Sequence, residues 1–157
     1  MKKILEVNNL QVSFHTYAGE VQSVRGVTFD ANEGEILAIV GESGCGKSVT
    51  SKTVMGLINT PPGEIKAGSE VLYLGKNILG QSEKEWEQYR GAECAMIFQD
   101  ALTSLNPTMQ IGKQVMENIT NHAKVSKEEA RKQAVEMLKL VKIPDAEMSM
   151  KKYPHEL

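Results

Sequence analysis

A glycine-rich octapeptide in the first third of the chain constrains the fold more strongly than any other feature of the sequence. It reads Gly41-Glu42-Ser43-Gly44-Cys45-Gly46-Lys47-Ser48 and fits the pattern G-x-x-x-x-G-K-[ST]. Glycines let successive backbone N–H groups converge on one anion, because they adopt conformations that are closed to residues with side chains. The pattern is typical of loops that bind nucleotide phosphates, so it predicts a site for ATP or GTP.

The end of the octapeptide and the helix predicted to follow it supply positive charge and a dipole. We expect Lys47 to reach the β- and γ-phosphates and the Ser48 hydroxyl to ligate Mg²⁺. A helix that begins near Gly46 would direct the partial positive charge of its N-terminus at the phosphates. The predicted nucleotide-binding residues are the eight residues of the octapeptide together with Val49.

The segments on either side of the octapeptide predict the order strand, loop, helix. Residues 36–40 are an unbroken apolar run, as expected for a strand buried on both faces of a parallel sheet. Residues 47–58 read as a helix that stops before Pro61 and Pro62, where the proline rings prevent its continuation. This order predicts an α/β fold with the octapeptide between strand and helix.

The composition limits the class of protein. With 157 residues, 41% of them hydrophobic, the chain is long enough for one core, and its net charge of −2 offers no basic surface for nucleic acid. Lys2 and Lys3 are not followed by the apolar region of a signal peptide. No run approaches the ~18 apolar residues that cross a bilayer, so we expect any membrane role to need a partner.

The two cysteines, Cys45 and Cys94, suggest neither a metal site nor a disulfide framework by their number or spacing. Cys45 lies inside the octapeptide, where backbone amides, Lys47 and a helix N-terminus favour a thiolate. We therefore hypothesise that Cys45 is unusually reactive. The alternative is that it is an inert small residue.

The rest of the chain divides into a strand-rich first part and a helical second part. Residues 3–14, 21–30 and 69–74 alternate apolar and polar side chains, which predicts an antiparallel sheet with one face in water. Capping boxes of the form Ser-x-x-Glu at Ser82 and Ser126 each open a predicted helix. Helices are expected over residues 82–90, 111–121 and 126–141, and a final turn over residues 147–152.

A second buried-strand candidate, residues 94–98, is followed by Gln99 and Asp100. Parallel sheets place ligand-facing residues at the carboxyl ends of their strands. One interpretation makes Asp100 the acidic partner of Mg²⁺, and another makes Gln99 the functional residue. Gln99 stands between the strand and the acid and so shifts Asp100 to the opposite face of the strand, which favours Gln99. The third interpretation is that both are ordinary polar residues at a strand end.

Six short stretches spread along the chain carry a resemblance to one protein family. They are residues 26–30 (GVTFD), 33–35 (EGE), 41–48, 96–100 (MIFQD), 103–107 (TSLNP) and 153–157 (YPHEL). In these stretches the chain resembles the ATP-binding subunits of ABC transporters, in particular the group that takes up oligopeptides, dipeptides and nickel. The group usually carries proline where this chain has Ala101, so we expect a slightly looser loop there.

The resemblance implies ATP and Mg²⁺ as cofactors and adds Gln99 and one aromatic residue to the site. Gln99 would be the catalytic glutamine of the Q-loop, contacting Mg²⁺ or the attacking water, so that Ser48 and Gln99 are the metal residues. An aromatic residue ahead of the octapeptide would stack on adenine, with Tyr17 as our first choice and Phe14 as the second.

The partners implied by the resemblance are transmembrane permease subunits, a second ATP-binding subunit in a homo- or heterodimer, and indirectly a substrate-binding protein. Residues 100–109 would lie where a permease subunit docks. The chain would then be held at the cytoplasmic face of the cell membrane by the permease.

The fold implied is a P-loop NTPase (RecA-like) α/β core that is incomplete, with an N-terminal antiparallel β subdomain and part of the ABC helical subdomain. The whole chain, 1–157, would be the N-terminal part of a nucleotide-binding domain, with the β subdomain and P-loop core in 1–99 and the partial helical subdomain in 100–157. In the family, Leu157 would begin the signature motif, and the catalytic glutamate and switch histidine would follow. His15, His122 and His155 are expected to be surface or packing residues.

Three functions remain open at this point. The favoured one is the ATP-hydrolysing motor subunit of an importer for peptides or related small solutes, of which this chain would be a fragment that binds nucleotide at most. The alternatives are a stand-alone P-loop kinase or GTPase that uses Asp100 for magnesium, and a regulatory ABC protein with no role in transport. The sequence does not distinguish oligopeptide, dipeptide, nickel and glutathione as solutes.

Overall fold

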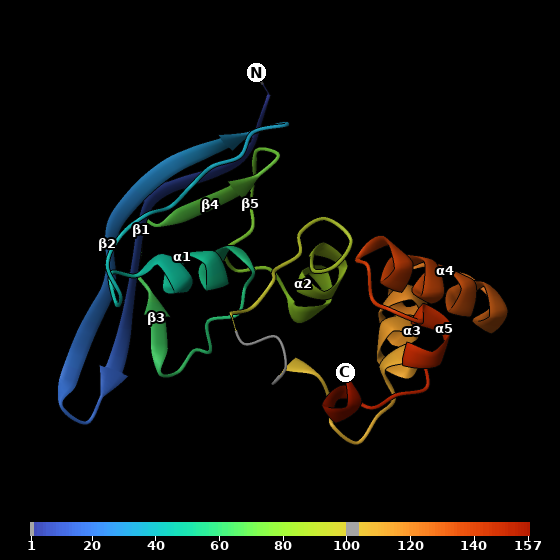
Figure 1. Ribbon diagram of the computed structural model, residues 1–157. Coiled ribbons are helices and arrows are strands. Elements are labelled where there is room, and N and C mark those ends of the chain that lie inside the picture. The colour runs from blue at the N-terminus through green and yellow to red at the C-terminus, as the bar shows by residue number, and fades with distance from the viewer. Residues whose placement is uncertain (1, 100–103) are drawn as a thin grey trace. The chain divides into compact units, whose positions relative to one another are not determined.

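The computed structural model describes residues 2–99 and 104–157 (Figure 1). Asp100 and Ala101, which carry two of the sequence expectations, lie outside the described residues. The chain forms two compact units, Met1–Glu87 and Gln88–Leu157. The octapeptide lies in the first unit and Gln99 in the second.

The first unit is built on an antiparallel sheet. Strands β1 (Lys3–Thr16) and β2 (Gly19–Asn32) form one long hairpin. Both β3 (Gly63–Ile65) and β4 (Glu70–Tyr73) pair with β1, and β5 (Lys76–Asn77) pairs with β4. The sheet confirms the prediction from alternating residues, which places apolar side chains on one face of each strand.

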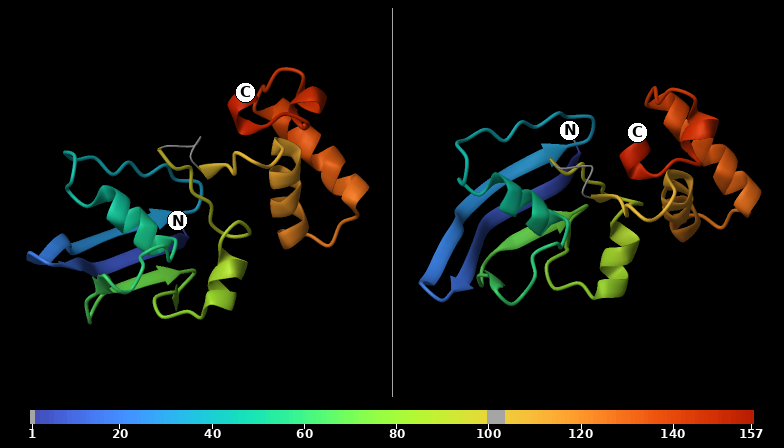
Figure 2. Two further views of the ribbon diagram at one scale, coloured as in Figure 1. Left: turned by 90° about the horizontal axis from the view of Figure 1, so that it is seen from below. Right: turned by 60° about the horizontal axis from the view of Figure 1, so that its bottom comes forward.

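The buried side of this sheet supports the helix that follows the octapeptide. The side chains of Val7, Leu10, Val12 and Val71 are completely buried. Helix α1 (Lys47–Val54) packs against β2, and Figure 2 shows it lying across one face of the sheet. Residues 33–46 lead from the end of β2 to the start of this helix, and Gly46 of the octapeptide lies against Ser23 of β2.

Helix α1 is shorter than the predicted range of 47–58. It ends at Val54, and Gly56 takes the left-handed conformation with φ of 62°. The Gly56 N–H donates to the Thr53 carbonyl and the Leu57 N–H to the Lys52 carbonyl, so the last turn is closed as at a typical glycine C-terminus. The glycine, rather than Pro61, ends the helix.

The prediction of a buried strand over residues 36–40 is wrong for this structure. No strand forms there, and the side chains of Ile36 and Val40 are 97% and 90% exposed. A strand of a parallel sheet needs hydrogen-bonded neighbours, and no described segment pairs with this one. Residues 94–98 differ from the prediction in the same way, since they hold one isolated bridge, Arg90 to Cys94, and Ile97 is 95% exposed.

The second unit is helical, as predicted. Helices α3 (Ile111–His122), α4 (Lys127–Leu140) and α5 (Ala146–Ser149) enclose a core of Ala134, Val135, Ala146 and Met150. Helix α2 (Glu83–Tyr89) begins in the first unit and ends in the second. The chain closes with a single 3₁₀ turn, Pro154–Glu156.

Both predicted capping boxes open helices. The Ser126 hydroxyl accepts from the Glu129 N–H at 3.2 Å, and the Glu85 carboxylate accepts from the Ser82 N–H at 2.9 Å. None of the helices in the described part of the chain combines the length and the apolar character needed to cross a membrane.

Candidate nucleotide-binding site

The octapeptide forms a turn whose shape depends on two glycines. Gly44 and Gly46 have φ values of 82° and 94°, in the left-handed region that disfavours side chains. A Cβ on Gly46 would also lie 2.5 Å from the backbone carbonyl oxygen of Ser23 in β2. The loop therefore sits directly on the strand, at a distance that only glycine permits.

The N-terminus of α1 keeps its backbone donors available. Gly46 is the N-cap, so no side chain caps the helix, and the first turn contains no acidic residue. The Thr50 N–H donates to the Gly46 carbonyl at 2.8 Å. The N–H groups that precede Thr50 in the helix have no intrahelical acceptor. Donors in this arrangement, together with the helix dipole, form an anion-binding site.

The ammonium group of Lys47 lies over the octapeptide. Its Nζ donates to the carbonyl oxygens of Gly41 at 2.7 Å and Glu42 at 2.6 Å, and lies 3.4 Å from Sγ of Cys45. These acceptors carry no full charge. A phosphate is a charged acceptor, and hydrogen bonds to ionised groups are roughly twice as strong. The lysine is thus placed beside the loop and can exchange its carbonyl partners for phosphate.

Two cavities are lined jointly by the octapeptide and β2. The smaller, of about 260 Å³, is lined by Ser23, Gly44 and residues 46–49, which include Lys47 and Ser48. The larger, of about 350 Å³, is lined by Gly44, Cys45, Val27 and residues 22–25 of β2. Both are lined by Ser23 and Gly44, so the two cavities adjoin each other.

The sequence analysis missed the contribution of β2 to this site. Ser23 lines both cavities, and Arg25 lines the larger one while its Nε donates to the Gln22 carbonyl. Alternation over residues 21–30 predicts a strand, but it carries no signal that the middle of the strand faces the octapeptide. That contact depends on the return of residues 33–46 along the sheet.

The residues of the loop are suited to bind Mg²⁺ together with nucleotide phosphates rather than alone. Ser48 is exposed in the first turn of α1, and its hydroxyl has no protein partner in the described part of the chain. Among the described residues no group of three or more His, Cys, Asp and Glu could hold a metal ion by itself. Mg²⁺ is commonly bound through one or two protein oxygens, substrate phosphates and water, which this arrangement matches.

The other predicted site residues lie outside the loop. Tyr17 is fully exposed in the turn between β1 and β2, whereas Phe14 is half-buried, with its ring 3.3 Å from the position of a Cβ on Gly63. Gln99 is exposed in the second unit. Asp100, its competitor for the magnesium role, lies outside the described residues.

The three histidines are placed at surfaces or packing contacts. His15 Nε2 lies 2.7 Å from the Glu64 carboxylate, an ion-pair geometry that the sequence did not indicate. The His122 ring lies against Gly91, and the His155 ring stacks on Tyr153 with 5.9 Å between centroids.

A glycine loop on a strand, a lysine over that loop and an uncapped helix N-terminus define the class of P-loop nucleotide-binding proteins. Comparison with protein families matches residues 24–157 to the family described as ABC transporter. The chain therefore belongs to the ABC transporter family.

The relatives of this chain include peptide transport proteins. It is 56% identical over 154 residues to the oligopeptide transport ATP-binding protein OppD of Bacillus subtilis, covering 98% of this chain and 43% of that protein. It is 54% identical over 156 residues to the dipeptide transport ATP-binding protein DppD of Lactococcus lactis, covering 99% of this chain and 44% of that protein. The chain thus spans less than half the length of these relatives.

Solved structures confirm the fold class. The dimeric structure of MJ0796, a bacterial ABC transporter cassette, superimposes with a TM-score of 0.82 at 22% identity, covering 98% of this chain and 63% of that one. CbiO1 of Clostridium perfringens, part of the ABC transporter complex cbiONQ, gives a TM-score of 0.70 at 22% identity, covering 100% and 56%. The chain is an incomplete ABC-type P-loop NTPase fold, with the antiparallel sheet and the helical unit both present.

Proposed function

We propose that this chain binds ATP as part of the ATPase subunit of an ABC importer for peptides or related small solutes. The observation that carries the proposal is the phosphate-binding geometry of Gly46 and Lys47 in a chain more than half identical to peptide transport ATP-binding proteins. Because the chain spans less than half of those relatives, nucleotide binding is proposed for the chain, and ATP hydrolysis and transport for the whole subunit.

The octapeptide and Val49 would hold the triphosphate. The backbone N–H groups at the start of α1 would donate to phosphate oxygens, and Lys47 would exchange its carbonyl partners for phosphate oxygens. Ser48 would hold Mg²⁺, which neutralises charge on the phosphates when it is bound. Gln99 is proposed as the second magnesium residue and as the glutamine that orients water, on the basis of its position in the family's motif.

Tyr17 is the better of the two candidates for stacking on the base. A nucleobase needs an exposed aromatic face. Tyr17 has an exposed aromatic face at the tip of the β1–β2 hairpin, whereas the ring of Phe14 packs against Gly63. Strand β2 connects this tip to Ser23 beneath the octapeptide.

The partners are proposed from the family and from the relatives. We infer that transmembrane permease subunits hold the protein at the cytoplasmic face of the membrane, with a substrate-binding protein acting indirectly. A second ATP-binding subunit would complete a dimer, since the structural relative MJ0796 was solved as one.

We also propose how the chain divides into subdomains, with a β subdomain and P-loop core in residues 1–99 and a partial helical subdomain in residues 100–157.

The test measures nucleotide binding by the purified chain. Binding is monitored by the fluorescence of a ribose-labelled ATP analogue in the presence of Mg²⁺. We expect saturable binding that unlabelled ATP displaces and that Lys47→Ala weakens by tenfold or more, about 1.4 kcal/mol or above. Equal affinity in the folded Lys47→Ala variant would overturn the proposal. Comparing Gln99→Ala with Asp100→Ala separates the transporter from a kinase or GTPase, in which Asp100 would dominate Mg²⁺-dependent affinity.

A further inference from the structure

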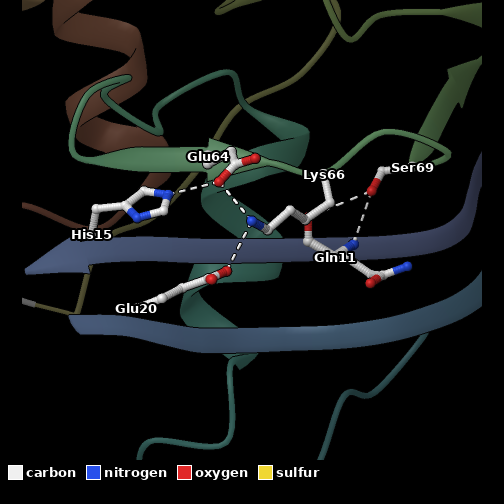
Figure 3. A network of polar contacts seen from close by, with 6 residues as sticks. All are labelled: Gln11, His15, Glu20, Glu64, Lys66 and Ser69. Atoms are coloured by element: carbon white, nitrogen blue, oxygen red, sulfur yellow. Dashed lines mark hydrogen bonds and ion pairs between the residues drawn. The ribbon is translucent and has the colours of Figure 1, made fainter.

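The tip of the β1–β2 hairpin is joined to β3 by a network of polar side-chain contacts (Figure 3). Its members, called here the hairpin brace, are His15 of β1, Glu20 of β2, Glu64 of β3 and Lys66, which directly follows β3. The nucleotide-binding residues described above do not include any of the four.

The brace is anchored on the backbone of β1. The Lys66 N–H donates to the Gln11 carbonyl at 3.0 Å, and the Gln11 N–H donates to the Ser69 hydroxyl at 3.0 Å. The turn between Lys66 and Ser69 is itself closed by a hydrogen bond from the Ser69 N–H to the Lys66 carbonyl. The Lys66 side chain therefore extends from a backbone that is hydrogen-bonded to β1 (Figure 3).

Two arms run from this anchor to the two strands of the hairpin. Lys66 Nζ lies 2.8 Å from the Glu20 carboxylate and 2.6 Å from that of Glu64. The same Glu64 oxygen lies 2.7 Å from Nε2 of His15. In the hairpin, His15 and Glu20 face each other, and the next pair, Thr16 and Gly19, closes the turn. Both strands are thus held at the last pair but one before the tip.

The tip carries Tyr17, the proposed base-stacking residue. The Thr16 hydroxyl donates to the Gly19 carbonyl at 2.8 Å, which closes the two-residue turn of Tyr17 and Ala18. From Gly19 to Ser23 the strand spans about 14 Å, and Ser23 is the residue that contacts the octapeptide. The brace therefore acts on the end of β2 far from the phosphates and near Tyr17.

We propose that Glu64 and Lys66 are positioning residues for the nucleobase, holding the hairpin tip so that Tyr17 presents its ring at a fixed distance from the phosphate loop. The proposal rests on ATP binding at the octapeptide. An isolated exposed ion pair contributes little to stability, but here one ammonium group bridges carboxylates on two strands from an anchored backbone. Lys66, the carboxylates of Glu20 and Glu64, and the ring of His15 are joined in this one network.

The test separates the base from the phosphates. Affinity is measured for Mg²⁺-ATP and for Mg²⁺-tripolyphosphate, which lacks the base, using the wild-type chain, Glu64→Gln and the matched control Glu70→Gln on β4. We expect Glu64→Gln to weaken the affinity for Mg²⁺-ATP by about three- to tenfold, in the range of couplings between contacting residues. Tripolyphosphate affinity is expected to stay unchanged, and Glu70→Gln to bind both as the wild type does.

A double-mutant cycle with Tyr17 distinguishes positioning from general stabilisation. Tyr17→Ala alone should weaken the affinity for ATP by about fivefold or more, which is the scale of base stacking on an aromatic ring. In that background Glu64→Gln should have no further effect on ATP affinity. Lys66→Met should reproduce the loss seen with Glu64→Gln, and Lys66→Arg, which keeps the charge, should restore ATP binding.

Three results would overturn the inference. One is parallel weakening of ATP and tripolyphosphate in folded Glu64→Gln, and another is an additive effect of Glu64→Gln and Tyr17→Ala. The third is wild-type affinity for ATP in both Glu64→Gln and Lys66→Met. If the folded wild-type chain binds neither compound, the proposed function itself fails, and the inference that rests on it fails too. Circular dichroism of each variant establishes folding, and Lys66→Met decides the matter if Glu64→Gln does not fold.

Discussion

Gly46 lies so close to Ser23 that a Cβ on the glycine would come within 2.5 Å of the Ser23 carbonyl oxygen. Glycine at position 46 permits both the left-handed turn of the phosphate loop and the close contact of that loop with β2. Gly44 is also left-handed, with φ of 82°, but a Cβ there would meet nothing within 4 Å. The two glycines therefore separate backbone strain from crowding.

We expect Gly46→Ala to destabilise the protein more than Gly44→Ala does. Both variants place alanine in the left-handed region, at a cost of about 1–2 kcal/mol. Gly46→Ala also forces the loop away from β2, and overpacking of this kind costs a further ~1–3 kcal/mol. Chemical denaturation of the two variants measures the difference, and equal stabilities would show that the loop does not rest on Ser23 in solution.

Nucleotide is expected to slow the modification of Cys45. The thiol is exposed inside the loop, with Lys47 Nζ at 3.4 Å. Phosphates bound at the loop would draw Lys47 away and cover Sγ. We expect maleimide to label Cys45 faster than a model thiol, and Mg²⁺-ATP to slow the reaction by about tenfold, the ratio expected at ATP ten times above its Kd.

Cys94 provides the control for this experiment within the same chain. It is half-buried in the second unit, so its labelling should be slower and should not respond to nucleotide. Labelling of Cys45 at the rate of a model thiol, with or without Mg²⁺-ATP, would contradict the hypothesis of a reactive cysteine. Lys47→Ala should abolish the protection by Mg²⁺-ATP.

The parts of the fold that could be predicted from sequence are those set by local rules. Alternation of side chains predicts strands β1, β2 and β4 of an antiparallel sheet, and the capping boxes at Ser82 and Ser126 predict the starts of α2 and α4. Likewise, the octapeptide predicts the loop and the start of α1 without reference to any distant residue. Hydrogen bonds and dihedral preferences within a few residues decide each of these features.

The errors arise where structure depends on partners distant in sequence. Residues 36–40 have the composition of a buried strand, but a strand requires a paired neighbour, and composition does not reveal whether one is within reach. The role of Ser23 in the site and the hydrogen bond between His15 and Glu64 are long-range contacts of the same kind. The end of α1 at Gly56 was a local signal, which the stronger signal of the prolines obscured.

Trp86 is expected to report the integrity of the first unit. It is the single tryptophan of the chain and is 8% exposed, and a Cβ on Gly56 would lie 2.5 Å from its ring. Gly56→Ala should lower the free energy of unfolding by about 2–4 kcal/mol, from left-handed strain and from displacement of the indole. The displaced ring should emit at longer wavelength. Gly75→Ala, which has similar φ but open space, should keep the wild-type emission, and a red shift in both variants would contradict this explanation.

The hairpin brace predicts how stability depends on pH. Hydrogen bonds from Lys66 and then His15 lower the pKa of Glu64 below its ordinary 4.5, and those from Lys66 and then Ser13 lower the pKa of Glu20. Each carboxylate therefore contributes stability above pH 4.5, which is lost as pH falls through its lowered pKa. Glu20 and then Glu64 raise the pKa of Lys66 above 10.5, so its contribution is complete below pH 10.5 and is lost as pH rises through the raised value. Thermal unfolding should show Glu64→Gln less stable than wild type at pH 7 and equal to it once acid has protonated Glu64, whereas Glu70→Gln should follow the wild type throughout. A constant difference between wild type and Glu64→Gln from pH 7 into strong acid would show that the carboxylate is not held by these partners.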